Sequence, residues 1–159
     1  MRAARSKIAP LADVRRHVAA ARAAHRTVAL ANGCFDILHV GHVRYLNAAK
    51  AEADVLVVAV NADASVRLLK GPDRPIMPED ERALLVAALR SVDHVLVFAE
   101  PDVRGIIEAL RPDVHCKGTD YTADTVPERD VVRAYGGRVA IVGDPKTHDT
   151  RNLIEKLRP

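Results

Sequence analysis

Six consecutive apolar residues at 55–60 constrain the fold of this chain more than any other feature of the sequence. Four of them are valines, and no polar residue interrupts the run. Such a run is typical of a strand that is buried on both faces, and strands of this kind occur in parallel sheets that helices cover on either side. The run therefore predicts an α/β protein with a parallel sheet.

Four more strand-like runs alternate with helical patterns along the chain. We expect these strands at 27–31, 94–98, 114–116 and 138–142. We expect helices at 11–25, from about 39 to 53, and at 63–69, 79–90, 102–110 and 126–135, with a last helix after Asp149 and Thr150. This alternation predicts a doubly wound, Rossmann-like parallel sheet of about five strands with helices on both faces. Ligands of such folds bind at the carboxyl ends of the strands.

Two finer expectations concern the helices that follow the run at 55–60. Asp63 is expected to cap the helix at 63–69. In the helix at 79–90, the apolar spacing indicates that Leu84, Leu85, Ala88 and Leu89 face inward. Between these helices, residues 70–78 hold three prolines and a glycine, so the chain is expected to form a functional loop there.

The N-terminal 26 residues differ in charge from the rest of the chain. They hold seven Arg or Lys and one acid, Asp13, so the net charge of +3 comes from this segment. An Arg-rich, acid-poor N-terminus is typical of transit peptides, but this one has a single Ser and an apolar stripe at Leu11, Val14, Val18 and Ala21. We therefore expect a basic N-terminal segment at 1–26, whose helix packs on one domain at 27–159.

Composition narrows the class of protein. The chain has no Trp and only five Phe or Tyr, so a nucleic-acid partner bound through aromatic stacking is not expected. No secretory signal and no apolar run of membrane-spanning length is present. Cys34 and Cys116 lie far apart, without the spacing of a disulfide framework or a zinc motif. We expect a cytoplasmic protein without a membrane partner.

Residues 31–42 form the stretch that holds the most candidate functional side chains. It reads Ala-Asn-Gly-Cys-Phe-Asp-Ile-Leu-His-Val-Gly-His and lies between a predicted strand and a predicted helix. His39 and His42 then share one face of the first helical turn, where unpaired N–H groups and the helix dipole favour anions. Gly41 leaves room for a ligand. The pattern predicts a polyphosphate site, whereas a zinc site would need a third ligand that is not obvious nearby.

The motif Gly-Cys-Phe-Asp-x-x-His-x-Gly-His at 33–42 resembles the HxGH signature of the nucleotidyltransferase superfamily, which includes cytidylyltransferases and adenylyltransferases of small phosphorylated substrates. The resemblance implies that a substrate phosphate oxygen attacks the α-phosphorus of a nucleoside triphosphate, and pyrophosphate leaves. A phosphate is already a competent nucleophile at neutral pH, so positioning and stabilisation of negative charge are the main tasks. The implied cofactor is Mg²⁺, carried by the phosphates.

The resemblance also implies roles for residues along the chain. The catalytic residues are expected to be His39, His42 and Lys70, with Lys70 as a mobile cation over the triphosphate. The nucleotide-binding residues are expected to be Gly33, Cys34, Phe35, Gly41, Lys117, Gly118, Asp120, Thr147 and Thr150. The substrate-binding residues are expected to be Asp36, Asn61, Asp63 and Arg82. Asp149 departs from the Ser-Thr-Thr pattern of relatives, and it either caps the last helix or meets the Mg²⁺.

Simpler interpretations of several of these residues stay open. Asp36 is also explained as a turn former and Cys34 as a small buried side chain. Lys70 is also explained as a solvated lysine, and Arg82 as a surface ion pair within its own helix.

Further segments, at 58–66, 69–75, 111–113, 117–121 and 132–137, resemble bacterial heptose 1-phosphate adenylyltransferases. This resemblance implies that AMP is transferred from ATP to D-glycero-D-manno-heptose 1-phosphate, giving ADP-heptose and pyrophosphate, in lipopolysaccharide biosynthesis. It also implies a homodimer, and a stand-alone transferase without the sugar kinase domain of many relatives.

Two other functions stay open. A cytidylyltransferase for glycerol 3-phosphate or another small alcohol phosphate would use the same signature. A non-catalytic nucleotide-binding sensor would keep the pocket, and its basic N-terminal segment would then suit a nucleic-acid partner. The presence of both histidines and Lys70 argues against the sensor.

Overall fold

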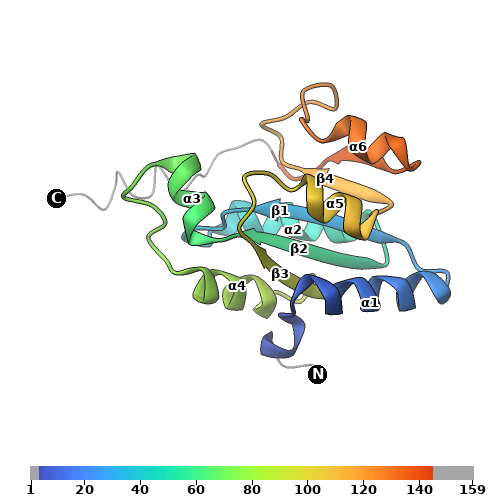
Figure 1. Cartoon of the computed structure of the whole chain (residues 1–159), viewed down its shortest axis with the longest axis horizontal. Coiled ribbons are helices and arrows are strands. Elements are labelled where there is room, and N and C mark those ends of the chain that lie inside the picture. The colour runs from blue at the N-terminus through green and yellow to red at the C-terminus, as the bar shows by residue number, and fades with distance from the viewer. Residues whose placement is uncertain (1–3, 145–159) are drawn as a thin grey trace.

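Strands and helices alternate along the chain, as the sequence predicts (Figure 1). The computed structural model describes residues 4–144, and the predicted last helix after Asp149 lies outside them. The elements are η1 (Ala4–Lys7), α1 (Leu11–Ala23), β1 (Val28–Gly33), α2 (Val40–Ala51), β2 (Val55–Asn61), α3 (Asp63–Lys70), α4 (Glu79–Ala88), β3 (His94–Phe98), α5 (Arg104–Leu110), β4 (Val114–Lys117), α6 (Arg129–Ala134) and β5 (Arg138–Ile141). None of the helices among the described residues is long and apolar enough to cross a membrane.

The five strands form one sheet in the order β3-β2-β1-β4-β5, and each neighbouring pair is parallel. The chain adds β2 and β3 on one side of β1 and then places β4 on the other side. The crevice between the carboxyl ends of β1 and β4 is therefore the switch point of a doubly wound sheet, where such folds bind their ligands. The predicted Rossmann-like α/β fold is confirmed.

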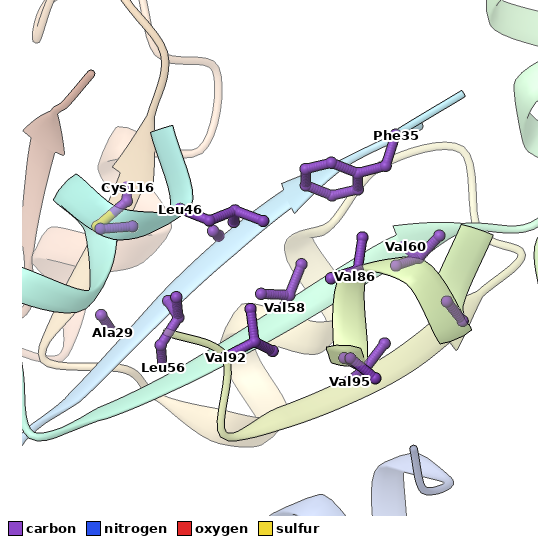
Figure 2. Close-up of a cluster of buried hydrophobic side chains, with 14 of the residues drawn as sticks. Ala29, Phe35, Leu46, Leu56, Val58, Val60, Val86, Val92, Val95 and Cys116 are labelled. Carbon is purple, nitrogen blue, oxygen red and sulfur yellow. The ribbon is translucent and has the colours of Figure 1, made fainter. Parts of the chain in front are cut away.

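Helices cover both faces of the sheet, because alternate strand residues point to opposite sides. On one face, Leu46 of α2 and Val86 of α4 pack against β1 and β2 (Figure 2). On the other face, Val14 of α1 and Ile107 of α5 pack against the remaining strand side chains. Every residue of β2 is buried, which is the arrangement that its unbroken apolar run predicts.

The N-terminal helix α1 packs on the domain through its apolar stripe. Val14, Val18 and Ala21 are buried, and the helix contacts β1, β3 and α5. Two arginines near its end bind backbone carbonyls of the domain: Arg22 donates to Leu110 at 2.9 Å and Arg26 to Asp54 at 3.1 Å. Two of the basic residues in this segment therefore hold the helix against the domain.

Of the two expectations about the helices after β2, one is wrong and the other is only partly confirmed. Asp63 does not cap α3, because the N-cap position is Ala62, and the first N–H of the helix, that of Asp63, donates instead to the Glu79 carboxylate at 2.7 Å. Of the residues expected to face inward, Leu85 and Ala88 are exposed, whereas Leu84 and Leu89 are half-buried and Leu89 packs against the core. The buried residues of α4 are Arg82, Ala83, Val86 and Ala87. The Asp63 carboxylate instead pairs with Arg82, with 2.7 Å between Oδ1 and Nη2, and Arg82 is buried beside the apolar residues of α4 that join the core.

Truncation of Leu46 tests the packing of α2 on the sheet. Leu46 is fully buried, so we expect Leu46→Ala to lower the free energy of unfolding by about 2–5 kcal/mol. Leu68 is a matched control because it is 80% exposed, and Leu68→Ala should change that free energy by less than about 0.5 kcal/mol. Urea denaturation measures both values, and similar losses in the two variants would contradict this packing.

Candidate active site

A cavity of about 680 Å³ opens at the carboxyl ends of β1, β2 and β4. Of the site residues predicted from the sequence, the cavity brings together Gly33, Cys34, Phe35, Asp36, His39, Gly41, His42, Asn61, Lys70, Lys117, Gly118 and Asp120. Asp63 and Arg82 do not line it. The predicted contacts of Thr147, Asp149 and Thr150 lie outside the described residues.

The turn from β1 into α2 builds the floor of this cavity. β1 extends two residues past its predicted end, so Asn32 and Gly33 still pair with β2. Phe35 then turns back with a φ of 49°, and its buried ring joins the cluster around Leu46 (Figure 2). A Cβ at Gly33 would lie 3.2 Å from that ring, which is tighter than side chains normally pack. A larger residue at position 33 would therefore require the Phe35 ring to shift by a few tenths of an ångström.

The two histidines of the signature stack on each other at the start of α2. Their ring centroids are 3.9 Å apart and their planes differ by 28°. Nδ1 of His39 accepts a hydrogen bond from the Gly41 N–H at 3.2 Å, and Nδ1 of His42 accepts from the His39 N–H at 3.4 Å. With both Nδ1 atoms acting as acceptors, each neutral ring carries its proton on Nε2. Two imidazole N–H donors thus stand beside the N-terminus of α2, where the helix dipole attracts anions.

Asp36 holds the segment that follows α3 against the cavity. Its carboxylate is almost fully buried and accepts hydrogen bonds from the backbone N–H groups of Ile76 and Met77 at 2.9–3.0 Å. Arg74 adds an ion pair at 2.6 Å. Lys70, exposed at the end of α3, also lines the cavity. Asp36 was expected to bind substrate, but its carboxylate is engaged by this segment, so the structure gives it an anchoring role.

Arg82 ties together three parts of the wall behind the cavity. Its guanidinium is fully buried and donates to the carbonyls of Met77 at 2.9 Å and Cys34 at 2.5 Å, in addition to its pair with Asp63. Direct contact with substrate, as the resemblance implies for Arg82 and Asp63, does not agree with this placement. A surface ion pair within α4 does not agree with it either.

Cys34 and Asn61 meet at the ends of β1 and β2. Sγ of Cys34 lies 3.9 Å from Oδ1 of Asn61, and both residues line the cavity. Burial raises the pKa of the Cys34 thiol, and the nearby Lys70 and Arg82 cations lower it by less. Cys34 is therefore a protonated, weakly polar wall residue and not a thiolate nucleophile.

A buried polar network closes the opposite side of the cavity. Lys117, at the end of β4, is 7% exposed, and its ammonium contacts Oδ1 of Asn32 at 3.1 Å and Glu128 at 3.3 Å. Nε2 of the fully buried His115 lies 3.2 Å from the same Asn32 oxygen. Burial, with a smaller effect of Lys117, lowers the pKa of His115 to about 3. His115 is thus a neutral imidazole inside the sheet.

The cavity also has lining residues that were not among the predicted site residues. Leu69, Arg74, Thr119 and Tyr121 lie in segments that the sequence had singled out, whereas Asn32, Arg44, Tyr45, Val142, Gly143 and Asp144 were missed. Asn32 directly precedes the signature, and Tyr45 follows His42 at helical spacing, so position relative to the signature was the available signal. Tyr45 also donates its hydroxyl proton to the Cys116 carbonyl at 2.8 Å, which fixes α2 against β4.

No group of three His, Cys, Asp or Glu side chains in residues 4–144 could hold a metal ion. The Asp120 and Asp144 carboxylates line the cavity, and Asp144 also forms an ion pair with Arg44 at 3.4 Å. This donor set fits an Mg²⁺ ion that is carried mainly by phosphate oxygens, because magnesium commonly takes one or two carboxylates and completes its shell with phosphates and water.

Comparisons with known proteins agree with this geometry. A family model described as cytidylyltransferase-like matches residues 30–155. The bifunctional protein HldE of Syntrophotalea carbinolica is 49% identical over 132 residues, which are 83% of this chain and 27% of that protein. HldE of Mesorhizobium japonicum is 51% identical over 143 residues, 90% of this chain and 29% of that protein. The chain therefore spans less than a third of the length of these relatives.

A solved structure extends the comparison to three dimensions. The crystal structure of the lipopolysaccharide core biosynthesis protein from Thermoplasma volcanium matches with a TM-score of 0.67 and 28% sequence identity. The match covers 76% of this chain and 99% of that one.

The anchoring role of Asp36 predicts local loosening in Asp36→Asn. The variant keeps the shape but loses the charge-assisted hydrogen bonds, so amide exchange at Ile76 and Met77 should quicken by roughly tenfold or more. Asp93→Asn is a matched control, since Asp93 accepts from the Leu56 N–H at 2.8 Å in a turn distant from this segment. Unchanged exchange at both amides in Asp36→Asn would contradict the anchoring role.

His115 predicts a loss of stability in acid. The native state binds a proton on His115 only near pH 3, whereas the unfolded chain binds it near the ordinary value of 6.5. Between these values the unfolded state holds more protons, so this contribution to stability falls as pH drops from 6.5 toward 3. Urea midpoints of wild type and His115→Gln, measured across this range, should converge in acid. Parallel pH profiles would show that His115 is not buried in its neutral form.

Proposed function

Because this chain belongs to the cytidylyltransferase-like family, we propose that it transfers AMP from ATP to D-glycero-D-manno-heptose 1-phosphate, giving ADP-heptose and pyrophosphate. One observation carries the reaction class: two stacked imidazoles, each with a proton on Nε2, lie at the N-terminus of α2 inside a cavity at the switch point of the sheet. The heptose and adenine assignments are supported by the likeness to HldE and to a lipopolysaccharide core biosynthesis protein.

The mechanism follows from where charge develops. A heptose phosphate oxygen attacks the α-phosphorus, a new P–O bond forms, and the bond to the bridging oxygen of pyrophosphate breaks. His39 and His42 donate from Nε2 to the phosphate oxygens, and the N-terminal amides of α2 add a fixed dipole. Lys70, on the exposed end of α3, contributes a cation from the side of the leaving group. Mg²⁺ would neutralise part of the triphosphate charge when bound with ATP.

A second function is favoured by the description of the family model. A cytidylyltransferase would use the same histidines and the same attack by a phosphate oxygen, with CTP and glycerol 3-phosphate or another small alcohol phosphate as substrates. The two functions differ only in their substrates: ATP with heptose 1-phosphate in the first, and CTP with an alcohol phosphate in the second.

We also propose a homodimer, since two-fold assemblies are common among soluble enzymes. Because the proposed reaction consumes ATP, we place it in the cytoplasm. Sedimentation of the protein at micromolar concentration tests the homodimer, and a 17.3 kDa monomer alone would contradict it.

A pyrophosphate-release screen tests the proposed function directly. Four nucleoside triphosphates are crossed with heptose 1-phosphate, glycerol 3-phosphate and further sugar phosphates, with Mg²⁺ present. We expect the highest rate with ATP and heptose 1-phosphate. Release with CTP and glycerol 3-phosphate alone would establish the second function, and no release with any pair would contradict both.

His39→Ala and His42→Ala test the phosphate site in the same assay. Each should lower turnover by roughly 10²-fold or more, the scale of losing one preorganised donor. Both rings are partly exposed, so the urea midpoint should change little. Near-normal turnover in both variants would contradict the assignment of the phosphate site.

A further inference from the structure

We infer that Asn32 is a specificity-determining residue, whose amide nitrogen donates a hydrogen bond to an uncharged acceptor on the base or ribose of the bound nucleotide. The inference rests on the proposed function, because it assumes that the cavity binds a nucleotide. It then states which part of that nucleotide lies next to Asn32. It comes from the network of Asn32, His115, Lys117 and Glu128 at the ends of β1 and β4.

The orientation of the Asn32 amide is fixed by its neighbours. The ammonium of Lys117 has three donors and no acceptor, so the Asn32 atom 3.1 Å from it must be the carbonyl oxygen. Nε2 of His115 approaches the same oxygen at 3.2 Å and therefore carries the proton of that ring. Two donors on one oxygen hold the amide in a single orientation.

The amide nitrogen of Asn32 is consequently turned away from Lys117 and His115. Asn32 is half-buried and lines the cavity. Both side-chain hydrogen-bond contacts of Asn32 within residues 4–144 are made by Oδ1, and the amide nitrogen is not one of the fully buried polar atoms without a partner there. The nitrogen is thus left to the cavity, where it offers two N–H donors to a ligand.

The ammonium of Lys117 is engaged by three groups of the protein. Its ammonium is directed at the Asn32 oxygen, at the Glu128 carboxylate and at the ring of Tyr121, whose centroid is 5.3 Å away. Its positive charge is compensated by the buried Glu128 at 3.3 Å. Lys117 therefore acts as a positioning residue for Asn32, and the nucleotide-binding role that the resemblance implies for it is indirect.

The two sides of the cavity differ in charge, which orients the nucleotide. The network side holds a compensated ion pair and a neutral imidazole. The α2 side holds two imidazoles, a helix N-terminus and, nearby, the exposed Lys70. Phosphates are bound at the positive side, so the uncharged part of the nucleotide extends toward Asn32.

Two ligands separate these parts in a binding experiment that needs no turnover. Isothermal titration calorimetry compares ATP with inorganic tripolyphosphate, which lacks base and ribose, for wild type, Asn32→Ala and Asn32→Asp. Asn32→Asp keeps an oxygen for Lys117 and His115, so it should fold, but it replaces the donor with an acceptor. We expect ATP affinity to fall by about 3- to 10-fold in Asn32→Ala and further in Asn32→Asp. Tripolyphosphate affinity should stay within about twofold in Asn32→Ala.

The double variant Lys117→Met/Glu128→Gln provides the matched control, because it removes the ion pair without leaving a buried charge. The double variant should weaken ATP binding, because the Asn32 amide is then no longer held in one orientation. It should leave tripolyphosphate binding unchanged. Loss of tripolyphosphate binding here, or equal weakening of both ligands in Asn32→Ala, would overturn the inference. Unchanged ATP binding in Asn32→Asp would do so as well.

The outcome is separable from that of the proposed function. If wild type binds ATP but releases pyrophosphate with no acceptor, the proposed function fails, and the comparison of ATP with tripolyphosphate still decides the role of Asn32. If wild type turns over normally and Asn32→Asp binds ATP as wild type does, the function stands and the inference falls.

Discussion

One buried guanidinium holds the walls of the cavity in register. Burying an arginine costs several kcal/mol unless its donors find acceptors, and Arg82 finds them in three separate segments. These acceptors are the carbonyl of Cys34 after β1, the carbonyl of Met77 before α4, and the carboxylate of Asp63 at the start of α3. Since an unpaired guanidinium would be costly, these contacts tie the ends of β1, α3 and α4 to one another.

The signature stretch divides its work between support and chemistry. Gly33, Phe35 and Asp36 serve support: the glycine admits the phenyl ring, and the carboxylate anchors the segment around Arg74. His39 and His42 carry the proposed chemistry, and backbone N–H groups orient both rings. A motif of ten residues therefore builds a rigid turn first, and the turn then presents the imidazoles at the start of α2.

Most of the fold could be predicted from the sequence, because it depends on local patterns. The apolar run of β2, the alternation of strands and helices, and the histidine pair at the start of α2 all follow from short-range spacing. The inward face of α4 could not be predicted in this way. Arg82 is polar, so apolar spacing does not place it inside, and the partners that bury it lie far away in the sequence. Asn32 was missed for a similar reason: its partners His115 and Lys117 lie more than 80 residues away, and only the pairing of β1 with β4 brings them together.

The same pairing explains how one crevice can sort the two ends of a nucleotide. At the switch point, β1 leads into a helix whose N-terminus faces the cavity, so that side gains positive potential from backbone dipoles without a buried charge. β4 leads into a loop, not directly into a helix, and the cation that ends it is compensated inside the protein by Glu128. Had Lys117 lacked this partner, both sides would attract phosphate and the bound triphosphate would have two competing orientations. Because Glu128 compensates Lys117, the crevice is electrostatically asymmetric, and in the proposed reaction this asymmetry favours the orientation that brings the α-phosphorus beside His39 and His42.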